Sequence, residues 1–111
     1  MRLLLFPVAM LAGSAIAEAQ ESANLVRGEA YARDRCAECH AIDRQTEYSP
    51  VLAAPRFERL ANTPGMTGMA LTAWLYSSHK SMPNLIVRGE NLYDLVAYIR
   101  SLKRQPPDAP K

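Results

Sequence analysis

The pentapeptide Cys36-Ala37-Glu38-Cys39-His40 is the most informative stretch of this sequence, because its C-x-x-C-H spacing is that of c-type haem attachment. On a helical turn the side chains at positions 36, 39 and 40 share one face. Two thiols on such a face can each form a thioether with one haem vinyl group, and the adjacent histidine can direct a ring nitrogen at the iron. Cys36 and Cys39 are the only cysteines in the chain. The stretch therefore predicts one covalently attached haem with His40 as an axial iron ligand.

Other interpretations of this motif have less support. A thioredoxin-like redox pair opens a helix after a strand in a βαβ pattern, and no such pattern surrounds Cys36. A structural zinc site needs four cysteine or histidine ligands, and only His79, far down the chain, is left to complete one. A disulfide between Cys36 and Cys39 would close a very small loop and constrain little. We therefore favour the haem interpretation.

Residues 1–19 have the features of a secretory signal peptide. Arg2 supplies a positive charge, and residues 3–12 form an apolar stretch that is too short to span a bilayer. Small residues follow, and they predict cleavage after Ala19 or, alternatively, after Ala17. An uncleaved membrane anchor is the other interpretation. We expect the rest of the chain to be exported to the periplasm.

The mature chain is short, with residues 20–105 expected to form one domain and residues 106–111 a disordered tail. A domain of this size buries a modest share of its surface and is only marginally stable without help. A covalently held haem would add a large apolar group to its core. Residues 1–19 contain one basic and one acidic residue, so their removal leaves the net charge of +2 unchanged. This near balance gives no support for nucleic-acid binding.

Helical patterns flank the motif. The first predicted helix covers residues 25–35, after a loose segment at 20–24, and Gly28 in its middle costs about 1 kcal/mol relative to alanine. Close approach of a second helix would offset that cost. The last predicted helix covers residues 90–103, although Arg88-Gly89-Glu90 lacks a Ser or Thr cap. The apolar stripe of the first helix would comprise Val26, Tyr31 and Ala32, and that of the last Leu92, Leu95, Val96, Ile99 and Leu102.

Two shorter helices are expected between these. One covers residues 56–61, and the other covers residues 68–76 with Thr67 as its N-cap. Trp74 is the only tryptophan, and we expect it in the core, with donation of its indole N–H to a haem propionate as the alternative. No strand pattern occurs anywhere in the sequence. The pattern therefore predicts an all-α protein.

The proline-containing loop after His40 is expected to support the iron ligand. A haem-ligating histidine normally donates its other ring N–H to a backbone carbonyl, which fixes the ring. Pro55 or Pro50 can offer that carbonyl, since proline has a backbone acceptor and no donor. The sequence leaves both open.

A second informative stretch, residues 77–87, has no helical period and contains Met82-Pro83. The thioether of methionine is a soft ligand suited to haem iron. Proline at position 83 keeps Met82 out of the helical region. Met82 is therefore predicted as the second axial ligand. The alternatives for this position are Met66, Met69 and His79.

From residue 20 onward the sequence resembles a class I cytochrome c, of the small bacterial periplasmic kind. The resemblance rests on Gly28 and Ala32 before the C-x-x-C-H motif, on the proline-containing loop, on Met82-Pro83, and on Leu95-Val96-Ala97-Tyr98-Ile99 in the last helix. It implies an all-α fold of three to four helices wrapped around one covalently bound haem, with the N- and C-terminal helices crossing.

The resemblance also implies roles by position. Cys36 and Cys39 would hold the haem, and His40 and Met82 would be its axial ligands. Pro55 best matches the family proline whose carbonyl accepts from the proximal histidine. Further expected contacts are Trp74 near the haem propionates, and Gly28 with Tyr31 or Ala32 against Leu95 and Tyr98.

These features favour a monomeric electron carrier. Ligation by His40 and Met82 would let the iron cycle between Fe(II) and Fe(III) with little structural change. Redox proteins would dock at the exposed haem edge, where Lys80 and Arg88 are candidate contacts. No acid–base pair, nucleophile motif or phosphate loop indicates an enzyme with a substrate pocket. The alternatives are a haem c subunit of a larger periplasmic dehydrogenase or oxidase, and an enzyme or gas sensor in which Met82 is displaceable.

Overall fold

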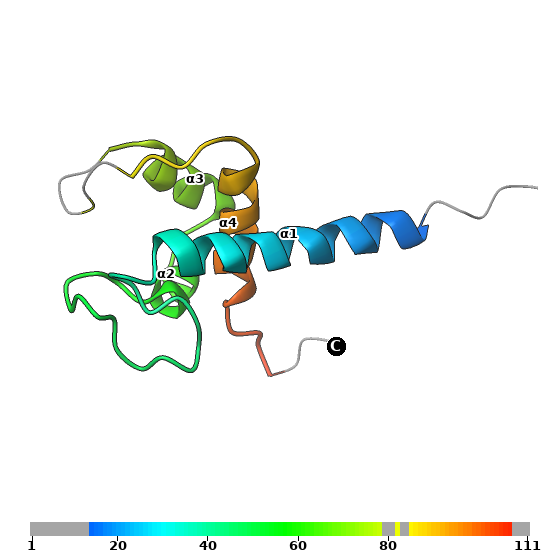
Figure 1. Ribbon diagram of the computed structural model, residues 1–111. Helices are drawn as coiled ribbons and strands as arrows, with labels where there is room; N and C mark the ends of the chain where they lie inside the picture. The colour runs from blue at the N-terminus through cyan, green and yellow to red at the C-terminus, as the bar shows by residue number, and fades with distance from the viewer. Residues whose placement is uncertain (1–13, 79–81, 83–84, 108–111) are drawn as a thin grey trace, which may run out of the picture.

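Four α-helices make up the computed structural model (Figure 1), which describes residues 14–78, 82 and 85–107, and only the backbone of residues 14–24. The helices are α1 (Ser14–Arg35), α2 (Phe57–Asn62), α3 (Gly68–Tyr76) and α4 (Gly89–Ser101). No strand occurs among the described residues. The predicted all-α class is therefore confirmed. None of the helices in the described ranges is long and apolar enough to cross a membrane.

The crossing of α1 over α4 dominates the arrangement, as Figure 1 shows. Gly28 lies at the contact, where an added Cβ would collide with the backbone carbonyl of Asp94 and come within 2.8 Å of the Tyr98 Cβ. Only glycine lets the two backbones approach so closely. Ala32, one turn later on the same face, is completely buried. The expected close approach of a second helix at Gly28 is confirmed.

The first helix differs from the prediction at its beginning. It starts at Ser14, so residues 20–24, expected to be loose, are helical. Residues 14–24 are rich in alanine, glutamate and glutamine, which are good helix formers. Val26 was expected in the apolar stripe, yet it is exposed. It lies two residues from Gly28, and therefore on the other side of α1 from α4.

The core gathers around α4, whose predicted apolar face is confirmed. α2 and α3 both pack on this helix. Its buried apolar residues are Leu92, Leu95, Tyr98, Ile99 and the following Leu102, and Val96 is partly buried. Phe57 and Ala61 from α2, Leu71 from α3, and Ile42 and Val87 from the loops complete the core. The helix begins at Gly89 with φ +61, and its N-cap Arg88 makes no side-chain capping bond within the described range 85–107.

The surroundings of α3 confirm one prediction and correct another. The Thr67 hydroxyl accepts a 3.1 Å hydrogen bond from the Ala70 N–H, as expected of an N-cap. Trp74, expected in the core, is 55% exposed. Leu71 and Leu75 are four residues apart and turn toward the core, and this orientation carries Trp74 toward the edge of the contact face.

Some expected features lie outside the described residues. Residues 1–13 contain most of the expected signal peptide, and residues 108–111 most of the expected tail. His79, Lys80 and Pro83 also lie outside. The signal peptide, its cleavage site and the tail stay predictions.

Candidate functional site

The C-x-x-C-H motif forms a turn that continues α1 beyond Arg35. The Cys36 N–H donates to the Ala32 carbonyl at 2.9 Å, and the His40 N–H donates to the Cys36 carbonyl at 2.9 Å. Both cysteines are unpaired thiols. Cys36 is 7% exposed within the core, whereas Cys39 is exposed. Burial raises the pKa of the Cys36 thiol to about 11.

The His40 ring is held by the segment that leads into α2. Its Nδ1 lies 2.7 Å from the backbone carbonyl oxygen of Pro55. A carbonyl oxygen only accepts, so Nδ1 carries the proton of this hydrogen bond and the bond leaves Nε2 unused. The Phe57 ring packs beside the imidazole, with 5.4 Å between the ring centroids. Of the two prolines that the sequence left open, Pro55 makes the contact.

Hydrogen bonds to the backbone fix the chain on both sides of His40. The Ala41 N–H donates to the buried Ser49 hydroxyl at 3.0 Å, and the Ala41 carbonyl accepts from the Phe57 N–H at 2.9 Å. On the other side the Cys39 carbonyl accepts from the Val51 N–H at 3.2 Å. The loop after the motif is therefore ordered around the histidine.

Tyr98 connects this loop to the helix crossing. Its hydroxyl donates a 2.9 Å hydrogen bond to the carbonyl of Ile42, two residues after His40. Burial of the phenol raises the pKa of Tyr98. Sequence reasoning placed Tyr98 at the helix crossing but missed this bond. A tyrosine on the apolar face of a helix was the signal, because a buried phenol needs a partner.

The buried Asp94 is a second feature that sequence reasoning missed. Its carboxylate receives two hydrogen bonds from Arg27, one from Nε at 2.7 Å and one from Nη2 at 3.3 Å. The hydrogen bond to Asp94 raises the pKa of Arg27. The pair lies beside Gly28, so it ties α1 to α4 at their closest approach. An acidic residue on the buried side of an amphipathic helix was the available signal.

The remaining candidate residues lie in α3 and in the chain on either side of it. Met82 is half-buried in the segment that connects α3 to α4, and Trp74 lies on α3. Of the alternative ligands, Met66 packs partly buried against the core and Met69 is exposed. The structure thus brings together Cys36, Cys39, His40 and Pro55 around one turn.

Cys36, Cys39 and His40, with Pro55 holding the histidine ring, form a set that fits a c-type haem. Two unpaired thiols and a histidine with Nε2 left for a metal are what covalent attachment and axial ligation need. No group of three or more histidine, cysteine, aspartate or glutamate side chains in the described ranges is arranged to hold a bare metal ion. No protein-family model, curated protein or solved structure matches this chain.

Proposed function

We propose that this chain is an electron-transfer protein of the class I cytochrome c type, with one covalently attached haem c. The observation that carries the proposal is the 2.7 Å contact between His40 Nδ1 and the Pro55 carbonyl, at the end of a C-x-x-C-H turn. Histidines that ligate metals almost always donate their other ring N–H to such an acceptor, which fixes the tautomer and the ring orientation.

The helix arrangement gives independent support. The resemblance implied that the helix before the motif crosses the last helix where Gly28 permits it, and α1 and α4 meet there. The crossing and the motif are linked within one chain segment, because α1 runs directly into Cys36. The same segment would therefore hold the haem and join the two terminal helices.

The residues have distinct roles in this proposal. Haem supplies a one-electron couple between Fe(II) and Fe(III) when it is bound. Cys36 and Cys39 would hold it covalently, and His40, fixed by Pro55, would ligate the iron. Met82 would be the second ligand, and its thioether would favour the ferrous form relative to a second histidine. The two hydrogen bonds of Ala41 fix the backbone next to His40. The histidine would therefore move little between the two oxidation states of the iron.

The proposed setting is the periplasm, with redox proteins as partners. A net charge of +2 allows only modest electrostatic steering of these partners. Contacts at the exposed haem edge would then contribute more to docking than long-range attraction.

An absorption spectrum of the ferric protein, expressed with a haem-attachment system, tests the proposal. We expect haem that stays attached after denaturation and a six-coordinate low-spin spectrum. Met82→Ala should turn high-spin, whereas Met69→Ala, at an exposed position, should keep the wild-type spectrum. A wild-type chain without covalent haem, or with high-spin haem, would overturn the proposal. A catalytic chain that co-purifies would instead favour the subunit of a larger dehydrogenase or oxidase.

A further inference from the structure

The short segment 55–57 holds the His40 ring at two points. The Pro55 carbonyl accepts from Nδ1, and the Phe57 ring packs beside the imidazole. Phe57 is also the first residue of α2. The position of the α2 N-terminus therefore sets the geometry of the hydrogen bond to His40.

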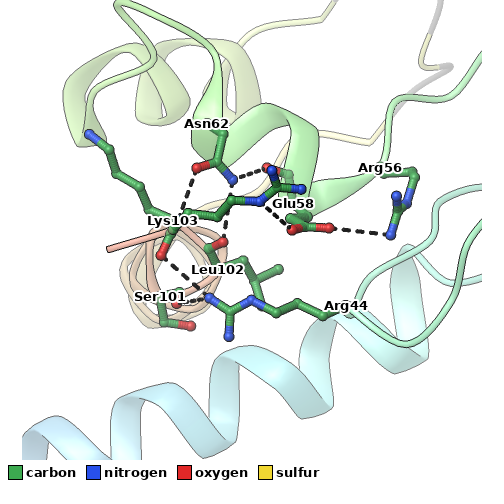
Figure 2. A network of polar contacts seen from close by, with 8 residues as sticks. Arg44, Arg56, Glu58, Asn62, Ser101, Leu102 and Lys103 are labelled. Atoms are coloured by element: carbon green, nitrogen blue, oxygen red, sulfur yellow. Dashed lines mark hydrogen bonds and ion pairs between the residues drawn. The ribbon is translucent and has the colours of Figure 1, made fainter. Parts of the chain in front are cut away.

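A carboxylate next to this segment connects it to the end of α4 (Figure 2). The Glu58 side chain is 14% exposed. One of its carboxylate oxygens accepts a hydrogen bond from Nη2 of Arg56 at 3.3 Å, and the other accepts one from Nε of Arg104 at 3.1 Å. Arg56 Nε is buried and has no hydrogen-bond partner among the described residues. Glu58 therefore supplies the negative charge that lets Arg56 remain beside Pro55.

Further hydrogen bonds make the far end of this connection rigid. Asn62 at the end of α2 accepts from the Arg104 N–H at 2.9 Å and donates to the Leu102 carbonyl at 3.4 Å. Arg44, in the loop after His40, donates to the Ser101 carbonyl at 3.1 Å and to the Lys103 carbonyl at 3.4 Å, as Figure 2 shows. The end of α4 is thus a fixed anchor for both segments that surround His40.

We infer that Arg56, Glu58 and Arg104 act as a clasp that positions the proximal histidine. This inference rests on the proposed function, since it concerns His40 as an iron ligand. Glu58 and Arg104 touch neither His40 nor Pro55 in the described contacts. They are positioning residues that act through the segment 55–57.

The clasp has a consequence for the redox potential. A firm hydrogen bond from Nδ1 to the Pro55 carbonyl raises the basicity of the ligating nitrogen. A more basic ligand stabilises the ferric form, so a looser hydrogen bond should raise the midpoint potential. The direct effect of charge is opposite for Arg104, because removing a positive charge disfavours the ferrous form and lowers the potential. The sign of the change in midpoint potential in Arg104→Gln therefore distinguishes a positioning role of Arg104 from a direct effect of its charge.

The experiment compares holoprotein variants by midpoint potential and by the solvent exchange of the His40 Nδ1 proton in nuclear magnetic resonance. Arg104 is suitable because its side chain is 78% exposed and dispensable to the core. We expect Arg104→Gln to raise the potential and to speed the exchange. The matched control is Arg33→Gln, which removes an exposed arginine from its 2.8 Å ion pair with Glu29 on α1. This variant should neither raise the potential nor speed the exchange.

Glu58→Asp tests the same positioning role without a change of charge. Glu58→Asp retains the carboxylate but shortens it, so it cannot reach both arginines, and we expect the same rise and the same faster exchange. A lower or unchanged potential in Arg104→Gln, with wild-type exchange, would overturn the clasp while leaving the proposed function intact. A wild-type protein without low-spin covalent haem would overturn both.

Discussion

The hydroxyl of Tyr98 in α4 lies 2.9 Å from the carbonyl oxygen of Ile42, two residues beyond the histidine of the C-x-x-C-H turn. This bond joins α4 to the loop that follows the C-x-x-C-H turn. Tyr98 also packs against Gly28 at the crossing of α1 and α4. The helix crossing and the loop that surrounds His40 therefore share one side chain.

Replacing Tyr98 with phenylalanine should weaken the fold. The change removes the hydroxyl and leaves the Ile42 carbonyl buried without its donor, which costs about 1–3 kcal/mol in the free energy of unfolding. Denaturant titration of the purified protein measures this loss. Tyr93→Phe is the control, because Tyr93 is 72% exposed on the same helix and should change stability by less than about 0.5 kcal/mol. Equal effects of the two variants would contradict the role of the bond.

The same tyrosine predicts a dependence on alkaline pH. Burial raises the pKa of Tyr98 above its ordinary value of 10.0, so the unfolded chain loses the phenolic proton before the folded chain does. The contribution of this group is fully present below pH 10.0 and is lost as the pH rises through the folded pKa. We expect the wild type to lose more stability than Tyr98→Phe over this range. The measurement is the free energy of unfolding at a series of alkaline pH values, and parallel curves for the two proteins would refute this.

Gly28→Ala should destabilise the helix crossing even though alanine is the better helix former. The new Cβ would collide with the Asp94 carbonyl, and overpacking of this kind typically costs about 1–3 kcal/mol. Gly68→Ala is the control, because its Cβ would meet only the movable end of the Arg100 side chain at 3.3 Å. Thermal unfolding of both variants measures the difference. A stabilised Gly28→Ala protein would contradict the close approach of α1 and α4 at this residue.

Ser49→Ala should affect both stability and the site. Without the hydroxyl, the Ala41 N–H is buried and unsatisfied, at a cost of about 1–3 kcal/mol. Because Ala41 follows His40, we also expect faster solvent exchange of the His40 Nδ1 proton. Ser78→Ala, at an exposed position after α3, should show neither change. Unchanged unfolding in Ser49→Ala would mean that another group takes over the hydrogen bond.

The parts of the fold that follow from local rules were predictable from the sequence. The spacing of Leu92, Leu95, Ile99 and Leu102 defines the buried face of α4, because a helix turns by a fixed angle per residue. The Thr67 cap depends on a partner three residues away. The C-x-x-C-H turn and its candidate haem are also local, since the motif spans only five residues.

Other features depend on residues far apart in the sequence, and only the tertiary structure decided them. The choice of Pro55 over Pro50 as partner of His40 depends on how the loop folds back, and the exposure of Trp74 depends on which side of α3 meets α4. The partners of Ser49 and Tyr98 likewise come from other segments. Local patterns determine which helices form and where the haem motif lies. Packing determines which carbonyl, hydroxyl or carboxylate contacts a residue of these helices or of the motif, because those groups come from distant segments of the chain.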